Sequence, residues 1–163
     1  MAFRMLLFTG FVLALTLVRP DFSLADFKAK VMSVQEGDRI TIYHSGRTQT
    51  LYLRGIDCPD PKQPYGKQAK RTTAAFVGGR DVTVRGMHQD RTGKAVAEVL
   101  LLDGRNVGHE LVKEGLAWVR PDTSAGKQLA EVQELARAEH RGLWSEPNPV
   151  PPWKWKQKRM FRQ

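Results

Sequence analysis

Apolar and polar residues alternate along much of the first half of the chain. In "DRITIYH", Ile40 and Ile42 are separated by single polar residues, and in "TQTLYLRGI" Leu51 and Leu53 repeat the same spacing. Successive side chains of a strand point to opposite faces, so each pair would bury one face of a half-buried strand. The pattern therefore predicts β structure through most of residues 26–56.

Turn residues divide this region and mark two later strands. Ser45-Gly46 separates the two alternating runs, and a two-residue connection of this kind is typical of a β-hairpin. Residues 81–87 and 95–102 read as two further strands, and the second is ended by Asp103-Gly104.

Helical periodicity falls between and after these strands. "YGKQAKRTTAAFVGG" (65–79), "NVGHELVKEG" (106–115) and "GKQLAEVQELARAEHRG" (126–142) carry small and apolar residues at three- and four-residue steps, and each ends in glycine. Strands followed by a helix, two more strands and two helices predict an α+β domain with a small antiparallel barrel or sheet.

The N-terminal segment has a different character. Arg4 precedes an apolar run from Met5 to Val18, and Ser23-Leu24-Ala25 follows. This order is typical of a secretory signal peptide, so residues 1–25 are expected to be removed and the protein to be periplasmic or secreted. The alternative is a short membrane anchor, but the run is short for a bilayer span and ends at Arg19-Pro20. No membrane span is expected after cleavage.

The charge balance limits the partners. The chain has 26 Lys and Arg against 17 Asp and Glu, a formal net charge of +9. Such an excess favours polyanions, namely nucleic acid, anionic lipid or cell-wall polymer, without choosing among them. Cys58 is the single cysteine, so an internal disulfide is excluded. We expect a monomer that needs no small-molecule cofactor.

Residues 147–163 form a tail that is rich in proline, tryptophan and basic residues. Its prolines predict an extended strap, and its cations interleave with aromatic residues. Lys154 and Lys156 could follow phosphates while neighbouring rings stack on bases. The alternative places Trp153 and Trp155 against the domain and leaves the terminal cations in solvent.

Carboxylates stand at the ends of neighbouring predicted strands. Asp38 begins one strand and Asp57 ends the next, so the two could converge on a hard cation. On spacing alone, the simpler interpretation is favoured, in which Asp38 is a turn residue and Asp57 caps the bend before Pro59. Arg54, Arg91 and Lys94 could likewise hold phosphate oxygens or be ordinary surface cations. The four histidines lie in different elements, and no zinc pattern, phosphate-binding glycine loop or nucleophile motif is present.

Taken in order, several motifs resemble the staphylococcal-nuclease-like (thermonuclease) family. They are "EGDRI", "LYLRGIDCPD", "QPYGKQAK", "DRTGKAVAEVLLLDGRNVGHELVKEGLAWV" and "RGLWSEPNPVPPWKW". The resemblance runs from about Lys30 to Glu146, and it assigns residues 26–146 to one domain. It implies an OB-type five-stranded barrel with about three helices. It also implies a calcium-dependent phosphodiesterase that cuts DNA or RNA, with single-stranded nucleic acid as the expected partner.

The resemblance assigns a metal site to this chain. Asp38 and Asp57 match the family's calcium carboxylates, and Cys58 would add its backbone carbonyl. Asp60 stands where the family has a glutamate that positions the attacking water. Aspartate is shorter by one methylene, and a water misplaced by roughly 1 Å can cost on the order of 100-fold in rate.

The phosphate-binding half of the site departs from the family. The place of the first family arginine, five residues before Asp57, holds Tyr52, and Arg54 lies two residues later. That is a displacement of roughly 7 Å along the same strand face. The second family arginine is replaced by Lys94, which keeps the charge and loses the bidentate fork. Thr92 replaces the aromatic residue that precedes it.

Three hypotheses follow. The first is an exported calcium-dependent endonuclease in which Asp60, Arg54 and Lys94 act on the substrate, with Arg39 or Arg91 as substitutes. Arg39 could instead form a salt bridge with Asp38. The second is a binding module of the same fold that holds nucleic acid or another polyanion without cutting it. The third is an interaction domain whose basic surface faces the cell envelope.

Overall fold

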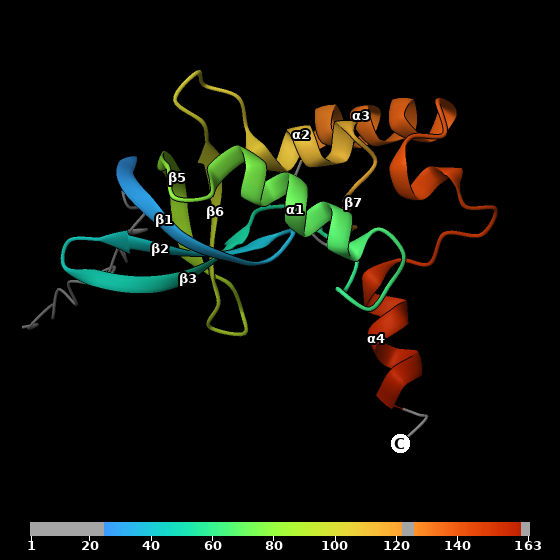
Figure 1. Ribbon diagram of the computed structural model, residues 1–163, viewed down its shortest axis with the longest axis horizontal. Helices are drawn as coiled ribbons and strands as arrows, with labels where there is room; N and C mark the ends of the chain where they lie inside the picture. The colour runs from blue at the N-terminus through green and yellow to red at the C-terminus, as the bar shows by residue number, and fades with distance from the viewer. Residues whose placement is uncertain (1–24, 122–125, 161–163) are drawn as a thin grey trace, which may run out of the picture.

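The structure is a computed structural model that describes residues 25–121 and 126–160 (Figure 1). Residues 1–24 of the predicted signal peptide and residues 161–163 lie outside this part of the chain. Within the described residues, no helix combines the length and apolar character needed to cross a bilayer.

Five strands close into a barrel in the order β1-β2-β3-β6-β5, and β5 pairs back onto β1. The β3–β6 pair is parallel, and the other pairs are antiparallel. The predicted five-stranded α+β barrel is confirmed. The barrel strands are β1 (Phe27–Glu36), β2 (Arg39–His44), β3 (Arg47–Leu53), β5 (Asp81–Gln89) and β6 (Ala95–Leu100). Two short strands, β4 (Ile56–Asp57) and β7 (Trp118–Val119), pair beside the barrel.

The alternation read from the sequence defines the barrel interior. Ile40 is paired with Leu51 across β2 and β3, and these side chains, with Ile42 and Leu53, are buried. The hairpin turn between β2 and β3 has Ser45 at φ 49° and Gly46 at φ 79°, both in the left-handed region that such two-residue connections require. Tyr52 consequently lies on the outer face of the barrel.

The helices cover one side of the barrel and its end. Figure 1 shows α1 crossing the front of the barrel, with α2 and α3 grouped above β7. The helix α1 buries Gly66, Ala69, Thr73 and Val77 and exposes its opposite face. The helical elements are α1 (Gly66–Val77), α2 (Val107–Lys113), α3 (Gly126–Ala138), the 3-10 turn η1 (Gly142–Ser145) and α4 (Pro152–Met160).

The C-terminal tail differs from the extended strap expected from its prolines. Residues 152–160 form α4, which begins at Pro152, and proline is well suited to a first helical turn because its missing N–H needs no partner there. Trp153 packs edge-on against Trp118 of β7, with ring centroids 5.9 Å apart, and Trp118 packs against Trp144 of η1 at 4.4 Å. This aromatic stack attaches α4 to the domain.

A close approach between α1 and the β1–β2 turn positions Asp38. A Cβ atom on Gly37 would lie 2.7 Å from Cys58 Sγ and 2.8 Å from Ala69 Cβ, so only glycine fits there. The buried Thr73 Oγ1 lies 2.6 Å from the carbonyl oxygen of Gly37 and 3.0 Å from that of Ala69. The hydroxyl of Thr73 thus ties α1 to the turn that presents Asp38.

We expect Thr73→Val to lower the free energy of unfolding by about 1–3 kcal/mol, because it leaves the buried carbonyl of Gly37 without its donor. Urea unfolding followed by circular dichroism measures this change. The matched control is Thr72→Val, at the preceding and partly exposed position of α1. It should change the free energy of unfolding by less than about 0.5 kcal/mol. Equal effects of the two substitutions would contradict the assigned role of Thr73.

Candidate metal and phosphate site

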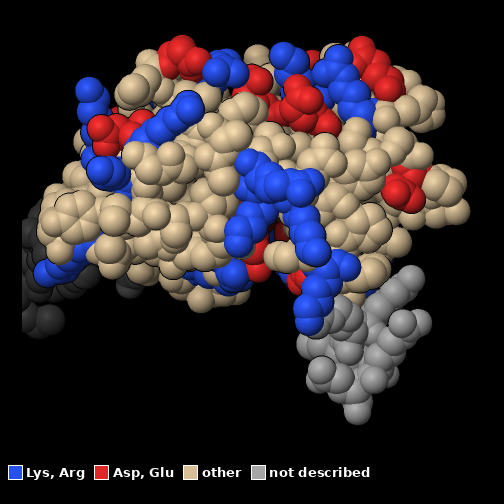
Figure 2. Space-filling view, viewed as in Figure 1, with Lys and Arg blue, Asp and Glu red and all other residues tan. Residues whose placement is uncertain are grey.

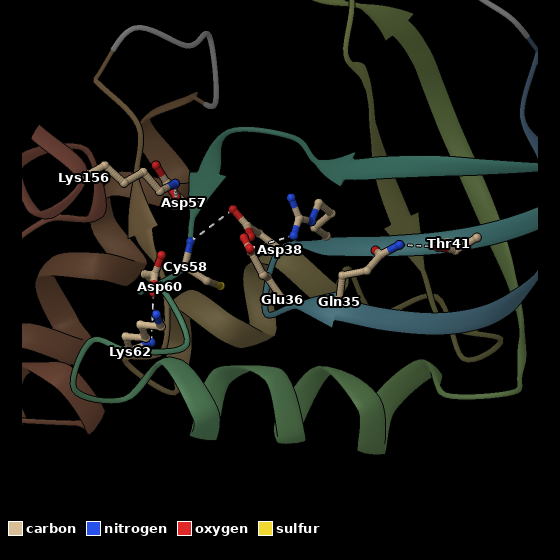
Figure 3. A network of polar contacts seen from close by, with 10 residues as sticks. Gln35, Glu36, Asp38, Thr41, Asp57, Cys58, Asp60, Lys62 and Lys156 are labelled. Carbon is tan, nitrogen blue, oxygen red and sulfur yellow. Dashed lines mark hydrogen bonds and ion pairs between the residues drawn. The ribbon is translucent and has the colours of Figure 1, made fainter. Parts of the chain in front are cut away.

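Asp38 and Asp57 come together beside the barrel. Asp38 lies in the turn between β1 and β2, and Asp57 ends β4. The two carboxylates are only 9% and 8% exposed. The backbone N–H of Cys58 donates to Asp38 Oδ2 at 3.2 Å, which links the two segments directly (Figure 3). The predicted convergence of these two residues is therefore present in the structure.

Burial disfavours the ionised form of both carboxylates. Burial, followed by the negative charge of Asp57, raises the pKa of Asp38 to about 7. Burial also raises the pKa of Asp57, although the nearby positive charge of Lys156 opposes this. Two buried carboxylates close together repel each other, so a cation between them would favour the ionised form of both.

Lys156 of α4 supplies part of that positive charge. Its Nζ lies 3.5 Å from Asp57 Oδ1, and Figure 3 shows Lys156 reaching this carboxylate from the C-terminal side of the molecule. The lysine is half exposed, whereas Asp57 is nearly enclosed. No local sequence signal could reveal this pair, because the two residues are 99 positions apart.

Asp60 lies in the loop that follows β4, near the carboxylate pair (Figure 3). Its Oδ1 accepts a hydrogen bond from the backbone N–H of Lys62 at 2.9 Å. Its own N–H donates to Gln63 Oε1 at 3.3 Å, and the amide of buried Gln63 donates to the carbonyl of Val150. Gln63 therefore connects the Asp60 loop to the segment that precedes α4.

Cys58 is buried beside the carboxylates and is unsuited to act as a thiolate. Burial, followed by the charge of Asp38, raises the pKa of its thiol well above the ordinary value. The side chain instead fills the space against Gly37. The backbone carbonyl of Cys58 as a cation ligand stays a prediction.

Glu36 is an additional acid that sequence reasoning overlooked. Its charge contributes to the raised pKa of both Asp38 and Asp57. Its Oε1 lies 2.7 Å from Arg39 Nη2, so the ion pair of Arg39 is with Glu36 and not with Asp38, the alternative that the sequence left open. The "EGDRI" motif contains Glu36, but the i,i+3 pairing across the β1–β2 turn depends on the fold.

A polar groove lies on the outer face of β2, β3 and β6, with a volume of about 510 Å³. Arg39 is opposite Tyr52 in the β2–β3 register, and Lys94 Nζ stands 4.9 Å from the centre of the Tyr52 ring. A hydrogen bond with Tyr52 and the charge of Glu36 raise the pKa of Arg39 further, so its guanidinium is always charged. Gln35 also lines the groove. It precedes Glu36 on β1, and the turn that carries Asp38 follows (Figure 3). The groove therefore presents two cations, and one of them, Arg39, directly follows Asp38 in the chain.

The loop before β6 holds Lys94 through Asp90. The Asp90 carboxylate accepts from the hydroxyl of Thr92 at 2.7 Å, from the N–H of Thr92 at 2.8 Å and from the N–H of Lys94 at 3.0 Å. These hydrogen bonds, with that of the Thr92 hydroxyl first, lower the pKa of Asp90. Arg91 lies in the same turn and is exposed.

Arg54 makes its side-chain contacts on β5 and β6. Its Nη2 donates to the carbonyl of Gly86, where the β5–β6 register shifts, and its Nη1 lies 3.6 Å from Glu98 Oε1. Arg54 is not among the residues that line the groove. Among the predicted site residues, the structure thus brings together Asp38, Asp57 and Cys58 with Asp60 and Lys156 nearby. It places Arg39 and Lys94 in the groove, and leaves Arg54 and the exposed Lys154 elsewhere.

The raised pKa of Asp38 can be tested by measuring the free energy of unfolding against pH. A chelator is present so that no metal ion binds the two carboxylates. Folding raises the pKa of Asp38 from 3.8 to about 7, so the folded state binds the extra proton between these values. The contribution of Asp38 to the free energy of unfolding is therefore fully present below about pH 4. It is lost as the pH rises through about 7. We expect the free energy of unfolding to fall by about 2–4 kcal/mol across this window. Asp38→Asn should flatten the fall in chemical denaturation, and an equally steep fall in that variant would contradict the assignment.

Comparison with known proteins places this arrangement in a family. The family described as staphylococcal nuclease homologue matches residues 50–146. An uncharacterized endonuclease of Escherichia coli O157:H7 is 36% identical over 135 residues, covering 83% of this chain and 88% of that protein. A micrococcal nuclease of Shigella flexneri is 31% identical over 145 residues, covering 81% and 82%. An uncharacterized endonuclease of Haemophilus influenzae is 30% identical over 128 residues, covering 78% and 71%. The chain therefore belongs to the staphylococcal nuclease family.

Proposed function

We propose that this protein is a calcium-dependent endonuclease that hydrolyses phosphodiester bonds in DNA or RNA. The observation that carries the proposal is the buried Asp38–Asp57 pair, which lies beside a groove lined by Arg39 and Lys94. The nuclease names of the family relatives point the same way.

The residues present fit a hard divalent cation. Asp38 and Asp57 offer carboxylate oxygens at a place where burial and mutual repulsion make a positive charge favourable. Within residues 25–121 and 126–160, no group of three or more His, Cys, Asp or Glu side chains is arranged to hold a metal. The backbone carbonyl of Cys58 and water would have to complete the shell, and oxygen ligands of this kind suit calcium. When bound, the ion would polarise a phosphoryl oxygen of the substrate.

The chain's own residues divide the remaining work. The Asp60 carboxylate, fixed by the Lys62 N–H, would orient the attacking water. Lys94 would stabilise the charge that develops on the phosphoryl oxygens. Lys156 Nζ pairs with Asp57 Oδ1 at 3.5 Å. When a cation occupies the site, Lys156 would give up this contact, and its ammonium group would remain close to the substrate.

We assign the missing guanidinium of the phosphate clamp to Arg39. The family position at Tyr52 lies directly opposite Arg39 in the β2–β3 register, so the charge is supplied from the neighbouring strand at the same level of the barrel. Arg54 has its partners in Gly86 and Glu98 and would first have to leave them. Arg39 is also paired, with Glu36 at 2.7 Å, but it lines the groove together with Lys94, which Arg54 does not. Arg39 is therefore our first choice for the clamp.

A binding module without cleavage is the second candidate. Tyr52, Asp60 and Lys94 all differ from the catalytic residues that the family resemblance implies, and each change weakens positioning more than charge attraction. The groove would still attract a single strand of nucleic acid, with the cations of α4 as further contacts. We also propose that the protein is exported, on the basis of its N-terminal charged, apolar and small-residue order.

Calcium-dependent cleavage is the direct test of the proposed activity. A fluorescent single-stranded DNA should be cut with calcium and remain intact in chelator. Asp57→Asn should lower the rate by about 100-fold or more, since it removes a ligand charge at the reacting centre. Asp103→Asn makes the same change at an exposed loop carboxylate and should leave the rate unchanged. Intact DNA at every calcium concentration, with binding retained, would favour the binding module.

The two arginines can be separated by a matched pair of variants. We expect Arg39→Gln to reduce kcat by on the order of 100-fold, because a donor to the developing phosphoryl charge is lost. Arg54→Gln should leave kcat nearly unchanged and show its effect as a lower unfolding midpoint. The reverse pattern would return the clamp to Arg54. Single-turnover kinetics with both variants, at saturating calcium, make the comparison.

A further inference from the structure

The outward face of α1 carries positive charge that pairs with no acid among the described residues. Between Asp60 and Asp81 the chain contains no acid and five basic residues. Lys67, Lys70 and Arg71 share one exposed face of the helix, since they are spaced by three and four residues. Lys62 is exposed in the loop just before. We call Lys62, Lys67, Lys70 and Arg71 the α1 basic face.

Several arginines elsewhere on the described surface pair with acids, as Arg85 does with Asp26 at 3.0 Å. Exposed cations of β1 and β3, such as Lys28 and Arg47, form no ion pair among the described residues and therefore offer a matched comparison. In the described part of the chain, no acid forms an ion pair with a member of the α1 basic face. Like charges at such spacing destabilise a helix by a few tenths of a kcal/mol per pair. A face that only needed solubility would carry charges of both signs.

The α1 basic face directly follows the loop that contains Asp60. A Cβ atom on Gly66 would lie 1.9 Å from the carbonyl oxygen of Asp60, so the first turn of α1 packs directly on that loop. Figure 2 shows Lys and Arg side chains gathered in a band over α1 that continues toward the loop before it. Lys67 and Arg71 are about 6 Å apart along the helix axis. The cations thus form a track that leads away from Asp60.

We infer that the α1 basic face binds the sugar–phosphate backbone of a nucleic acid strand, at nucleotides beyond those in the cleavage site. The inference rests on the proposed function for the identity of the polyanion. The face consists of three lysines and one arginine on the outside of α1 and of the loop before it, and we expect such cations to contact phosphates without reading bases. Its contribution should therefore grow with strand length and be independent of sequence.

The test compares two triple variants of the full chain in chelator, where the strand cannot be cut. One is Lys67→Gln/Lys70→Gln/Arg71→Gln, and the control, Lys28→Gln/Lys30→Gln/Arg47→Gln, removes the same charge from exposed positions of β1 and β3. Affinity is measured by fluorescence anisotropy for a hexanucleotide and for a strand about four times as long, over a range of salt. Circular dichroism verifies that both variants are folded.

For the long strand, we expect the α1 variant to bind about tenfold more weakly at low salt, with a slope of log K against log salt smaller by about 2. Hexanucleotide binding, and its cleavage in calcium, should match the unmodified chain. The control should retain the full slope. An unchanged slope in the α1 variant, or an equal loss in the control, would overturn the inference.

Two further outcomes separate this inference from the proposed function. If the unmodified chain binds long strands through the α1 basic face but cuts neither substrate in calcium, the endonuclease proposal fails and the inference stands. If the chain binds no oligonucleotide, and the α1 variant instead loses binding to phosphatidylglycerol vesicles, the face serves an anionic membrane surface and the inference is overturned.

Discussion

The repulsion between two buried carboxylates is the constraint around which the site is built. Asp38 and Asp57 are each more than nine-tenths enclosed, and burial raises the pKa of both. Their proximity is maintained by close packing and by hydrogen bonds from neighbouring segments. The turn at Gly37 packs on Cys58, and Thr73 bonds that turn from α1. The packing energy of the barrel and α1 thus stabilises a pair that would separate if it were free in solution.

Positive charge is distributed around this pair at three distances. Lys156 contacts Asp57 directly, Arg39 and Lys94 line the adjoining groove, and the cations of α1 lie farther out. The inner lysine compensates a carboxylate, whereas the outer cations have few acids to compensate. Such a gradient attracts a polyanion from a distance and leaves the innermost position suited to a small cation.

The sequence predicts the barrel better than it predicts the site. Alternation at Ile40, Ile42, Leu51 and Leu53 is a local signal of burial, and the structure buries all four. The convergence of Asp38 and Asp57 also follows from strand ends that lie close in sequence. Local signals fail at α4, where prolines favoured an extended strap but Pro152 begins a helix.

Contacts between distant residues account for the other differences. Strand alternation correctly put Tyr52 and Arg54 on one face, yet the partner of each is set by other strands. Tyr52 meets Arg39 and Lys94, while Arg54 meets Gly86 and Glu98. The Lys156–Asp57 pair spans the domain and leaves no local pattern. Side-chain partners of this kind depend on register and closure, which periodicity does not encode.

The 99-residue separation between Lys156 and Asp57 has a consequence for the order of assembly. The ribosome delivers Asp57 well before Lys156, and the same is true of any machinery that passes the chain N-terminus first. Loop closure over such a span is entropically costly and comes after the local hairpins. The barrel can therefore close while Asp57 still lacks the ammonium of Lys156. The charge of Asp57 is compensated by Lys156 only after α4 has been made and Trp153 has packed on Trp118.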